Sequence, residues 1–406
     1  MSAFVKIALG VVTGIGGFLD AGTIATSAQA GARFQYRLLW VIALGTLALI
    51  FITEMLGRLA AVSKHTLAGA IRERFGIKYQ ALPLLAELFL DITVLAAELG
   101  GIAMALKLMT SIGFEWWAFP CGLAVWGLLW RGRFEAIENG VALFGLVTLS
   151  FVWGALTLHP SYHDVIAGLA PSLPSQKPTE YWFIAVSILG SLLSPYVLNF
   201  YSAGAVEEKW KPQELTENKL AGGVGMSFGG IVAAAVLVAC AMTLFPRGIQ
   251  AQTYDEMHLS LALPLGPKLG TTLFALSLGI ACFGAALQVA LNLSYTLAQA
   301  LGWNWGEDLE PADDGRFAAV YTIVIPIAAA IVAVGVDPLK VTTIAMAFNV
   351  IVMPALVLPL LVVMNDEDYL GPYTNGWISN IVVTGVTVLG FVCAVAAIPL
   401  QLAGGG

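Results

Sequence analysis

The sequence carries little charge. Only 11% of its 406 residues are Asp, Glu, Lys or Arg, and 58% are hydrophobic; a soluble domain usually contains about 25% charged residues. Apolar runs of about 20 residues, the length that crosses a bilayer as a helix, recur along the whole chain. This composition excludes a soluble protein. It indicates an all-α integral membrane protein whose surroundings are the lipid bilayer.

Histidine and cysteine are also scarce. The four histidines all fall in loops or at the ends of apolar runs: His65, His159, His163 and His258. The four cysteines have no Cys-x-x-Cys spacing, which favours packing over metal or thiol chemistry: Cys121, Cys240, Cys282 and Cys393. Because no apolar run contains a histidine, an intramembrane protease of the His-Glu-x-x-His type and a Ser–His hydrolase are excluded. We therefore expect neither enzymatic activity nor a resident cofactor.

Long hydrophilic segments and an excess of basic residues are absent as well. The net charge is −7, so we expect no nucleic-acid partner, and no obligate protein partner is evident. The chain is predicted to be a single transmembrane domain, 1–406, with a first repeat at about 1–158, a second at about 180–364 and an extra span at about 376–401. Eleven transmembrane helices are expected, at about 5–33, 37–62, 81–110, 116–130, 134–158, 180–206, 218–245, 269–301, 316–336, 339–364 and 376–401.

The distribution of Lys and Arg predicts the orientation in the membrane. With a cytoplasmic N-terminus, twelve of the nineteen basic residues lie on the cytoplasmic side. Cytoplasmic loops carry such an excess in membrane proteins. We therefore expect a multi-pass protein of the cell (plasma or inner) membrane, with the N-terminus inside and the C-terminus outside.

Asp20 lies in the middle of the first span, in the stretch GFLDAGTIATSAQAG (17–31). An ionisable residue at bilayer depth marks a site or an ion pathway by default, and Asp20 has no Lys or Arg partner in its own span. Ala21 and Gly22 follow it and predict a break, because glycine weakens a helix and can free backbone carbonyls. The alternative is that Asp20 only forms a hydrogen bond to another helix.

A second break is predicted in the sixth span, in ILGSLLSPYVLNFYSAG (188–204). Pro195 cannot donate to the helix ladder and frees the carbonyl of Ser191, while Ser194 and Tyr196 offer hydroxyl groups. A kink that serves only packing is the alternative. Interrupted helices at corresponding positions of two inverted halves indicate the midplane site of a transporter. Asp20 and residues 191–196 are therefore expected to face each other.

At these residues the chain resembles the NRAMP family of divalent-metal transporters. The first-span motif Asp-Pro-Gly-Asn stands here as Asp20-Ala21-Gly22-Thr23, and the sixth-span Met-Pro-His as Ser194-Pro195-Tyr196. Residues 37–76, 96–101, 131–140 and 353–377 resemble further family segments in the same order. The resemblance implies a LeuT-like fold in which spans 1–5 and 6–10 form inverted repeats with broken helices 1 and 6, followed by an eleventh span.

The departures from the family fall on functional positions. The family's metal-binding asparagine and methionine are replaced by Thr23 and Ser194. The third-span Asp-x-x-Glu keeps only Glu98, because Leu95 stands in place of the aspartate. The tenth-span glutamine aligns with Met346, and Asn349, one turn later, is expected to take over part of its role. Much of the family's proton path is therefore missing.

These replacements change the ligands that are available to a metal ion. The expected ligands are the side chains of Asp20, Thr23 and Ser194 and the backbone carbonyls of Gly17 and Ser191. Such an all-oxygen set suits Mg²⁺ and Mn²⁺ better than softer ions. In losing the methionine, the sequence resembles most closely the NRAMP-related magnesium transporters.

The third span contains three acidic residues on one helix face, Glu87, Asp91 and Glu98. They predict an acidic vestibule for cations; the alternative is that Glu87 is solvated and the other two pair with neighbouring helices. Glu54 is expected to form a salt bridge or a gate contact near Arg58. The same is expected of Glu135 and Glu138 near the arginines beside them. Further pathway residues are expected: Tyr196, Asn199, Met346 and Asn349.

The sequence thus predicts a secondary transporter that moves Mg²⁺, and also Mn²⁺, by alternating access. The expected mechanism is uniport without obligatory proton coupling. One alternative is a proton-coupled Mn²⁺/Fe²⁺ symporter of the NRAMP type. An amino-acid/cation symporter with the LeuT fold is another, although Asp20 would repel a substrate carboxylate. A purely structural or receptor role would leave the paired breaks without a purpose.

Overall fold

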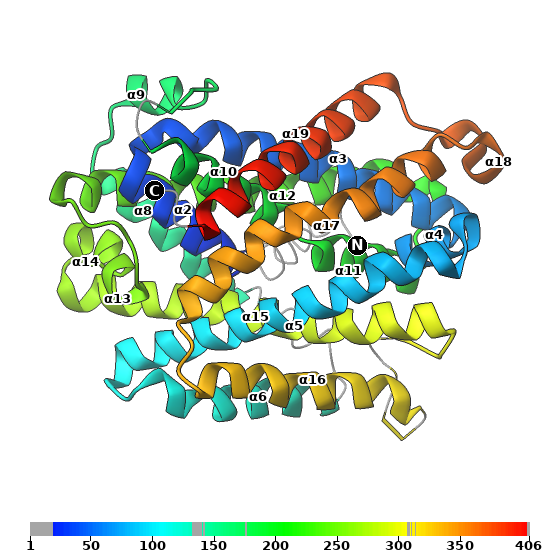
Figure 1. Ribbon diagram of the computed structural model, residues 1–406, viewed down its shortest axis with the longest axis horizontal. Coiled ribbons are helices and arrows are strands. Elements are labelled where there is room, and N and C mark those ends of the chain that lie inside the picture. Colours follow the sequence, from blue (N-terminus) through cyan, green and yellow to red (C-terminus); the bar gives the residue numbers. More distant parts are fainter. Residues whose placement is uncertain are drawn as a thin grey trace.

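The computed structural model describes residues 19–131, 140, 143–174, 177–306, 309, 311, 312 and 314–403, and every regular element in these ranges is helical (Figure 1). The α-helices are α2 (Ala21–Phe34), α3 (Leu39–Ser63), α4 (Leu67–Phe75), α5 (Ile77–Thr110), α6 (Phe114–Arg131), α8 (Leu149–Thr157), α9 (Tyr162–Ala167), α10 (Pro178–Leu192), α11 (Pro195–Glu207), α12 (Leu215–Thr243), α13 (Tyr254–Met257), α14 (Leu259–Leu265), α15 (Pro267–Leu301), α16 (Gly315–Ala333), α17 (Pro338–Met364), α18 (Glu367–Leu370) and α19 (Trp377–Leu402).

Eight helical stretches among the described residues are long and apolar enough to cross a membrane. One of them, Ala21–Ser63, contains two helices, α2 and α3, which a 3-10 turn at Gln35–Leu38 separates. α6 and the shorter apolar helix Leu143–Thr157 occupy the expected fourth and fifth spans. A described helix therefore stands at each of the eleven expected positions, and the chain is a multi-pass membrane protein.

Equivalent helices of the two halves pack against each other. α2 contacts α10, α3 contacts α12, α5 contacts α15 and α6 contacts α16. Figure 1 shows α5 beside α15, with α6 and α16 below them. The eleventh helix, α19, lies outside this arrangement and packs on α17, α10 and α3.

Short helices mark the two ends of the bundle. α9, α13 and α14 lie at one end and α4 and α18 at the other (Figure 1); we call these the α9 end and the α18 end. Near the α18 end, Arg58 on α3 pairs with Glu54 at 3.1 Å, which confirms that expected salt bridge. Glu135 and Glu138 lie outside the described residues.

On α5, apolar side chains face outward and acidic side chains face inward, the reverse of a surface helix in a soluble protein. Leu82 and Phe89 are 70% and 72% exposed, on the face that lipid would cover, whereas Glu87 is only 2% exposed. The acidic residues of this helix therefore point into the protein, where no lipid reaches them. The alternative in which Glu87 is solvated is wrong, because α5 turns this face toward α11 and α15.

Candidate metal site at the paired helix breaks

The first break lies at Asp20. Its backbone is extended (φ −130°, ψ 177°), and the helix α2 begins at Ala21. The Asp20 carboxylate caps this helix by accepting a hydrogen bond from the backbone N–H of Thr23 at 2.6 Å. The expectation that the break falls on Ala21 and Gly22 is therefore wrong. With Asp20 as the cap, both residues fit into the first turn of α2.

A second carboxylate holds the same helix end. Oε2 of Glu98 accepts a hydrogen bond from the backbone N–H of Ala21 at 3.0 Å. Asp20 and Glu98 thus both lie where the α2 dipole favours negative charge. Both side chains are buried, and Oε1 of Glu98 has no hydrogen-bond partner in the described part of the chain.

The second break lies between α10 and α11. α10 ends at Leu192, and α11 begins with Pro195 at its first position, where the missing N–H costs nothing. The Ser194 hydroxyl donates back to the carbonyls of Gly190 at 2.8 Å and Ser191 at 3.4 Å. The predicted break at Pro195 is confirmed. It frees the Gly190 carbonyl as well as that of Ser191.

The two breaks meet, as the sequence predicts. The Tyr196 hydroxyl on α11 donates to Oδ2 of Asp20 at 3.1 Å. Thr26, on the next turn of α2, lies 3.4 Å from the Ser191 hydroxyl and donates to the Gly22 carbonyl at 2.8 Å. Thr26 was not predicted as a site residue, although its i+3 spacing from Thr23 places it on the same helix face.

α17 contributes Asn349 and Met346. The Asn349 side-chain amide donates to the Ser194 hydroxyl at 2.9 Å and to the Gly190 carbonyl at 3.2 Å. The Met346 sulfur lies 3.9 Å from the Ser194 hydroxyl oxygen and packs on Gly22, where an added Cβ would come within 2.5 Å of it. The expected all-oxygen ligand set did not count this thioether, which enters from α17.

Several oxygen atoms at the breaks have no hydrogen-bond partner among the described residues. They are the Thr23 hydroxyl, Oδ1 of Asn349 and Oε1 of Glu98. The described part of the chain holds no group of three or more His, Cys, Asp and Glu side chains that could bind a metal ion. A cation here would therefore rely on at most two carboxylates, Asp20 and Glu98, together with neutral hydroxyl, amide and carbonyl oxygens. Gly17, whose carbonyl is an expected ligand, lies outside the described residues.

The other expected pathway residues form a separate group. Asn199 on α11 donates to Glu87, and Asn292 on α15 donates to Asp91. Asn292 was not predicted, yet Gln288, Asn292, Thr296 and Gln299 follow helical spacing on α15 and could have indicated this polar face. Of the three acidic residues on α5, only Glu98 contacts the break at Asp20, whereas Glu87 contacts α11 at Asn199, three residues beyond Tyr196.

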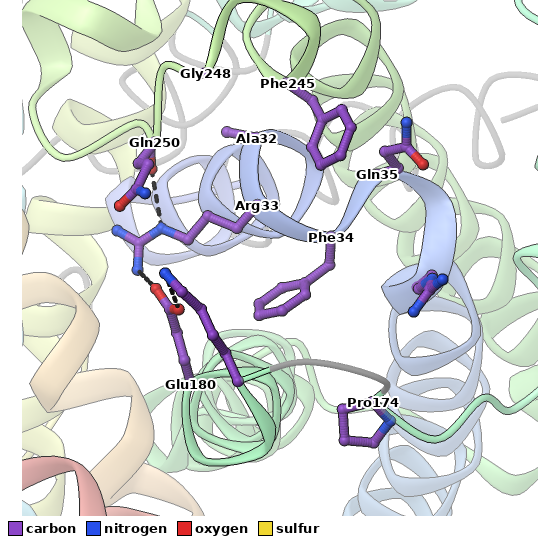
Figure 2. A pocket seen from close by; sticks show the side chains of 11 residues that line it. Ala32, Arg33, Phe34, Gln35, Pro174, Glu180, Phe245, Gly248 and Gln250 are labelled. Carbon is purple, nitrogen blue, oxygen red and sulfur yellow. Dashed lines mark hydrogen bonds and ion pairs between the residues drawn. The ribbon is translucent and has the colours of Figure 1, made fainter. Parts of the chain in front are cut away.

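A cavity of about 360 Å³ lies at the C-terminal end of α2. Figure 2 shows Arg33 between Gln250 and Glu180. Arg33 donates to the Gln250 carbonyl at 2.9 Å and pairs with Glu180 at 2.6 Å, and Lys177 pairs with the same carboxylate at 3.2 Å. These contacts fasten the ends of α2 and α10 to the segment that precedes α13.

The chain matches one protein family over nearly its whole length. Residues 10–399 match the model of the natural resistance-associated macrophage protein-like family, Nramp. The chain belongs to this family. It is 25% identical over 399 residues to the divalent metal cation transporter MntH of Caldanaerobacter subterraneus, covering 95% of this chain and 90% of that one. It is 27% identical over 406 residues to MntH of Deinococcus radiodurans, covering 95% and 86%.

Solved structures agree on the fold. A mutant of the Eremococcus coleocola manganese transporter superposes with a TM-score of 0.80 at 20% identity, covering 97% of this chain and 86% of that one. Mhp1, a nucleobase-cation-symport-1 family transporter, superposes with a TM-score of 0.62 at 12% identity, covering 96% and 91%. The all-helical LeuT-like fold is thus confirmed for this Nramp protein. The break in the sixth span is visible between α10 and α11, whereas the first span is described only from Leu19 onward.

Proposed function

We propose that this Nramp protein is a secondary transporter that moves Mg²⁺ and Mn²⁺ by alternating access. The observation that carries the proposal is Asp20, a buried carboxylate at a helix break that faces the second break through Tyr196. Paired interruptions of this kind mark midplane sites in transporters. The names of the relatives, divalent metal cation transporter and manganese transporter, support a divalent cation as the substrate.

The ligands at the breaks favour hard cations. Asp20 supplies the carboxylate that caps α2, with Glu98 beside it, and Thr23 and Ser194 supply hydroxyl oxygens in place of the family's amide and thioether. Mg²⁺ retains several waters and binds through one or two carboxylates, which suits such a site. Met346 adds one sulfur beside Ser194, so Mn²⁺ is expected to compete with Mg²⁺ for the same position.

We assign uniport rather than proton symport because two groups of the family's proton path are absent. Tyr196 replaces the sixth-span histidine, and its hydroxyl is used to hold Asp20. Leu95 replaces the third-span aspartate and is fully buried among apolar neighbours. With the N-terminus inside, at the cell membrane, the membrane potential would draw the divalent cation inward. The chain acts as one domain built from the two repeats.

A second candidate is a proton-coupled Mn²⁺ symporter. Two observations favour it: the thioether of Met346 at the breaks and the buried Glu98 carboxylate beside Asp20. Both candidates use the same metal site. They differ in whether a proton crosses with the metal ion.

Proteoliposomes loaded with a pH-sensitive dye separate the two candidates. We expect Mg²⁺ and Mn²⁺ to enter down their gradients, to compete with each other and to cause no metal-dependent acidification. Protein-free liposomes serve as the control for leak, and liposomes that contain Asp20→Asn protein test the metal site separately. Stoichiometric proton entry with the metal would establish the symporter instead, and uptake equal to that of the control would exclude both candidates.

A further inference from the structure

Four buried polar side chains from three helices form two hydrogen-bonded pairs between the breaks and the α18 end, one helical turn apart along α5. Glu87 and Asp91 come from α5, Asn199 from α11 and Asn292 from α15, and the most exposed of them, Asn199, is 6% exposed. We call this group the acid–amide cluster. Asn199 donates to both carboxylate oxygens of Glu87, at 2.9 and 3.0 Å, and Asn292 donates to Oδ2 of Asp91 at 2.8 Å.

Several oxygen atoms of the acid–amide cluster have no hydrogen-bond partner among the residues that the structure describes. Each amide uses its N–H group on a carboxylate, so the carbonyl oxygens Oδ1 of Asn199 and Asn292 are left without a donor, as is Oδ1 of Asp91. The Thr296 hydroxyl, one turn beyond Asn292, also has no partner in the described part of the chain. Buried polar groups in native proteins are almost always satisfied. The cluster therefore has a surplus of oxygen acceptors.

The charge of the cluster is also unbalanced. Glu87 and Asp91 are one helical turn apart on α5, a spacing at which like charges repel. Among the described residues no Lys, Arg or His forms an ion pair with either carboxylate. Buried charges in proteins are usually paired or coordinate metal ions. A bound cation would satisfy both the charge and the free oxygens.

We propose that the acid–amide cluster is a second divalent-cation site, separate from the site at the breaks. Its donors are carboxylate and amide oxygens without sulfur, a set that suits Mg²⁺, Ca²⁺ and Mn²⁺. The proposal rests on the proposed function only for the nature of the ion. The site requires neither Asp20 nor any particular coupling mechanism.

The cluster stands on the route that an ion would take from the breaks. Asp91 is seven residues before Glu98 on α5, about 10 Å along the helix axis at 1.5 Å per residue. On α11, Asn199 follows Tyr196 by three residues and therefore lies on the same face. An ion released by Asp20 toward the α18 end would meet the cluster next, so the second site would hold the ion on its way through.

Counting bound metal ions tests the proposal. Full-length protein in nanodiscs, stripped of metal and kept in 150 mM NaCl, is titrated with Mn²⁺, and free Mn²⁺ is measured by electron paramagnetic resonance. We expect two equivalents for the wild type, one for Asp20→Asn, one for Asp91→Asn and none for the double variant. Asp368→Asn, which changes an exposed carboxylate on α18, should retain two. Glu87→Gln provides a second lesion if Asp91→Asn protein does not elute as a single species.

The outcomes separate the two proposals. Retention of one equivalent in Asp20→Asn, and its loss in the double variant, supports the cluster as a site. A wild type that binds one equivalent, unchanged by Asp91→Asn and by Glu87→Gln, overturns it and leaves the two carboxylates sharing protons. If Asp20→Asn retains two equivalents while Asp91→Asn loses one, the second site stands and the proposed transport site at the breaks fails.

Discussion

The two helix breaks share a geometry but differ in chemistry. At the first break, Asp20 and Glu98 place two carboxylates on the N-terminus of α2. At the second break, Ser194 makes no capping bond to α11 and instead joins Gly190 and Asn349 in a neutral network. One half of the transporter thus supplies the charge, and the other supplies neutral oxygens. Binding strength should depend on the first break, and ion preference on the second.

Removal of the Asp20 carboxylate should reduce metal transport more than any other substitution considered below. Asp20→Ala or Asp20→Asn is expected to abolish Mg²⁺ and Mn²⁺ transport, a loss greater than the roughly 10- to 100-fold that follows loss of an outer partner of a metal ligand. The protein should still elute as a single folded species, because Glu98 continues to cap Ala21. Proteoliposome uptake measures the effect. Transport near the wild-type rate would show that the charged half is not where metal binds.

The second break should be the less tolerant of added volume. A Cβ at Gly190 would lie 1.7 Å from the backbone carbonyl oxygen of Met346, and a helix backbone cannot yield locally. Gly190→Ala is therefore expected to destabilise the protein by more than the roughly 1–3 kcal/mol typical of overpacking. Thermal unfolding followed by size exclusion measures it. Gly127→Ala, with no atom within 4 Å of the added Cβ, is the matched control.

The equivalent change at the first break should be milder. A Cβ at Gly22 would meet the Met346 side chain, at 2.5 Å from its sulfur, and that side chain can turn away. Gly22→Ala should cost within the roughly 1–3 kcal/mol range of overpacking, and Met346→Ala in the same protein should restore most of the loss. Equal losses at Gly22 and Gly190 would mean that Met346 is as fixed as the backbone.

Substitutions at the second break, which supplies the neutral ligands, should change the preference of the site for one ion over another. Ser194→Met places a second thioether beside Met346, so affinity for Cd²⁺ should rise relative to Mg²⁺ by about tenfold, or 1.4 kcal/mol. The added bulk should also disfavour hydrated Mg²⁺. Calorimetric titration of both ions measures the change, and Met346→Leu should shift the preference the other way. If neither variant alters the Cd²⁺ to Mg²⁺ ratio, the neutral half does not set selectivity.

Local signals in the sequence were enough to find both breaks. A carboxylate at bilayer depth and a proline in the sixth span each disturb a helix where they stand, so Asp20, Ser194 and Pro195 could be identified without any contact information. The meeting of Asp20 with Tyr196 followed from the repeat symmetry, and the structure confirms it at 3.1 Å.

Partners on other helices could not be read from the sequence. Whether Met346 points at Gly22 depends on the rotation of α17 about its own axis. An almost uniformly apolar helix gives no periodic signal for that angle. Asn292 meets Asp91 because α15 packs along α5. Local pattern could place Asn292 on a polar face of α15 but could not identify the acid on α5 that it contacts.

The cavity at the end of α2 has a consequence for how ions arrive. Its lining includes three cationic side chains, Arg33, Arg37 and Lys177, and one carboxylate, Glu180. Arg33 and Lys177 share the one carboxylate of Glu180, so even without Arg37 a divalent cation that enters there meets a repulsive potential, which acts on it with twice the force felt by a monovalent ion. The counter-ion atmosphere reaches about 30 Å at 0.01 M salt but only about 8 Å at 0.15 M. Entry from this side should therefore become faster as ionic strength rises.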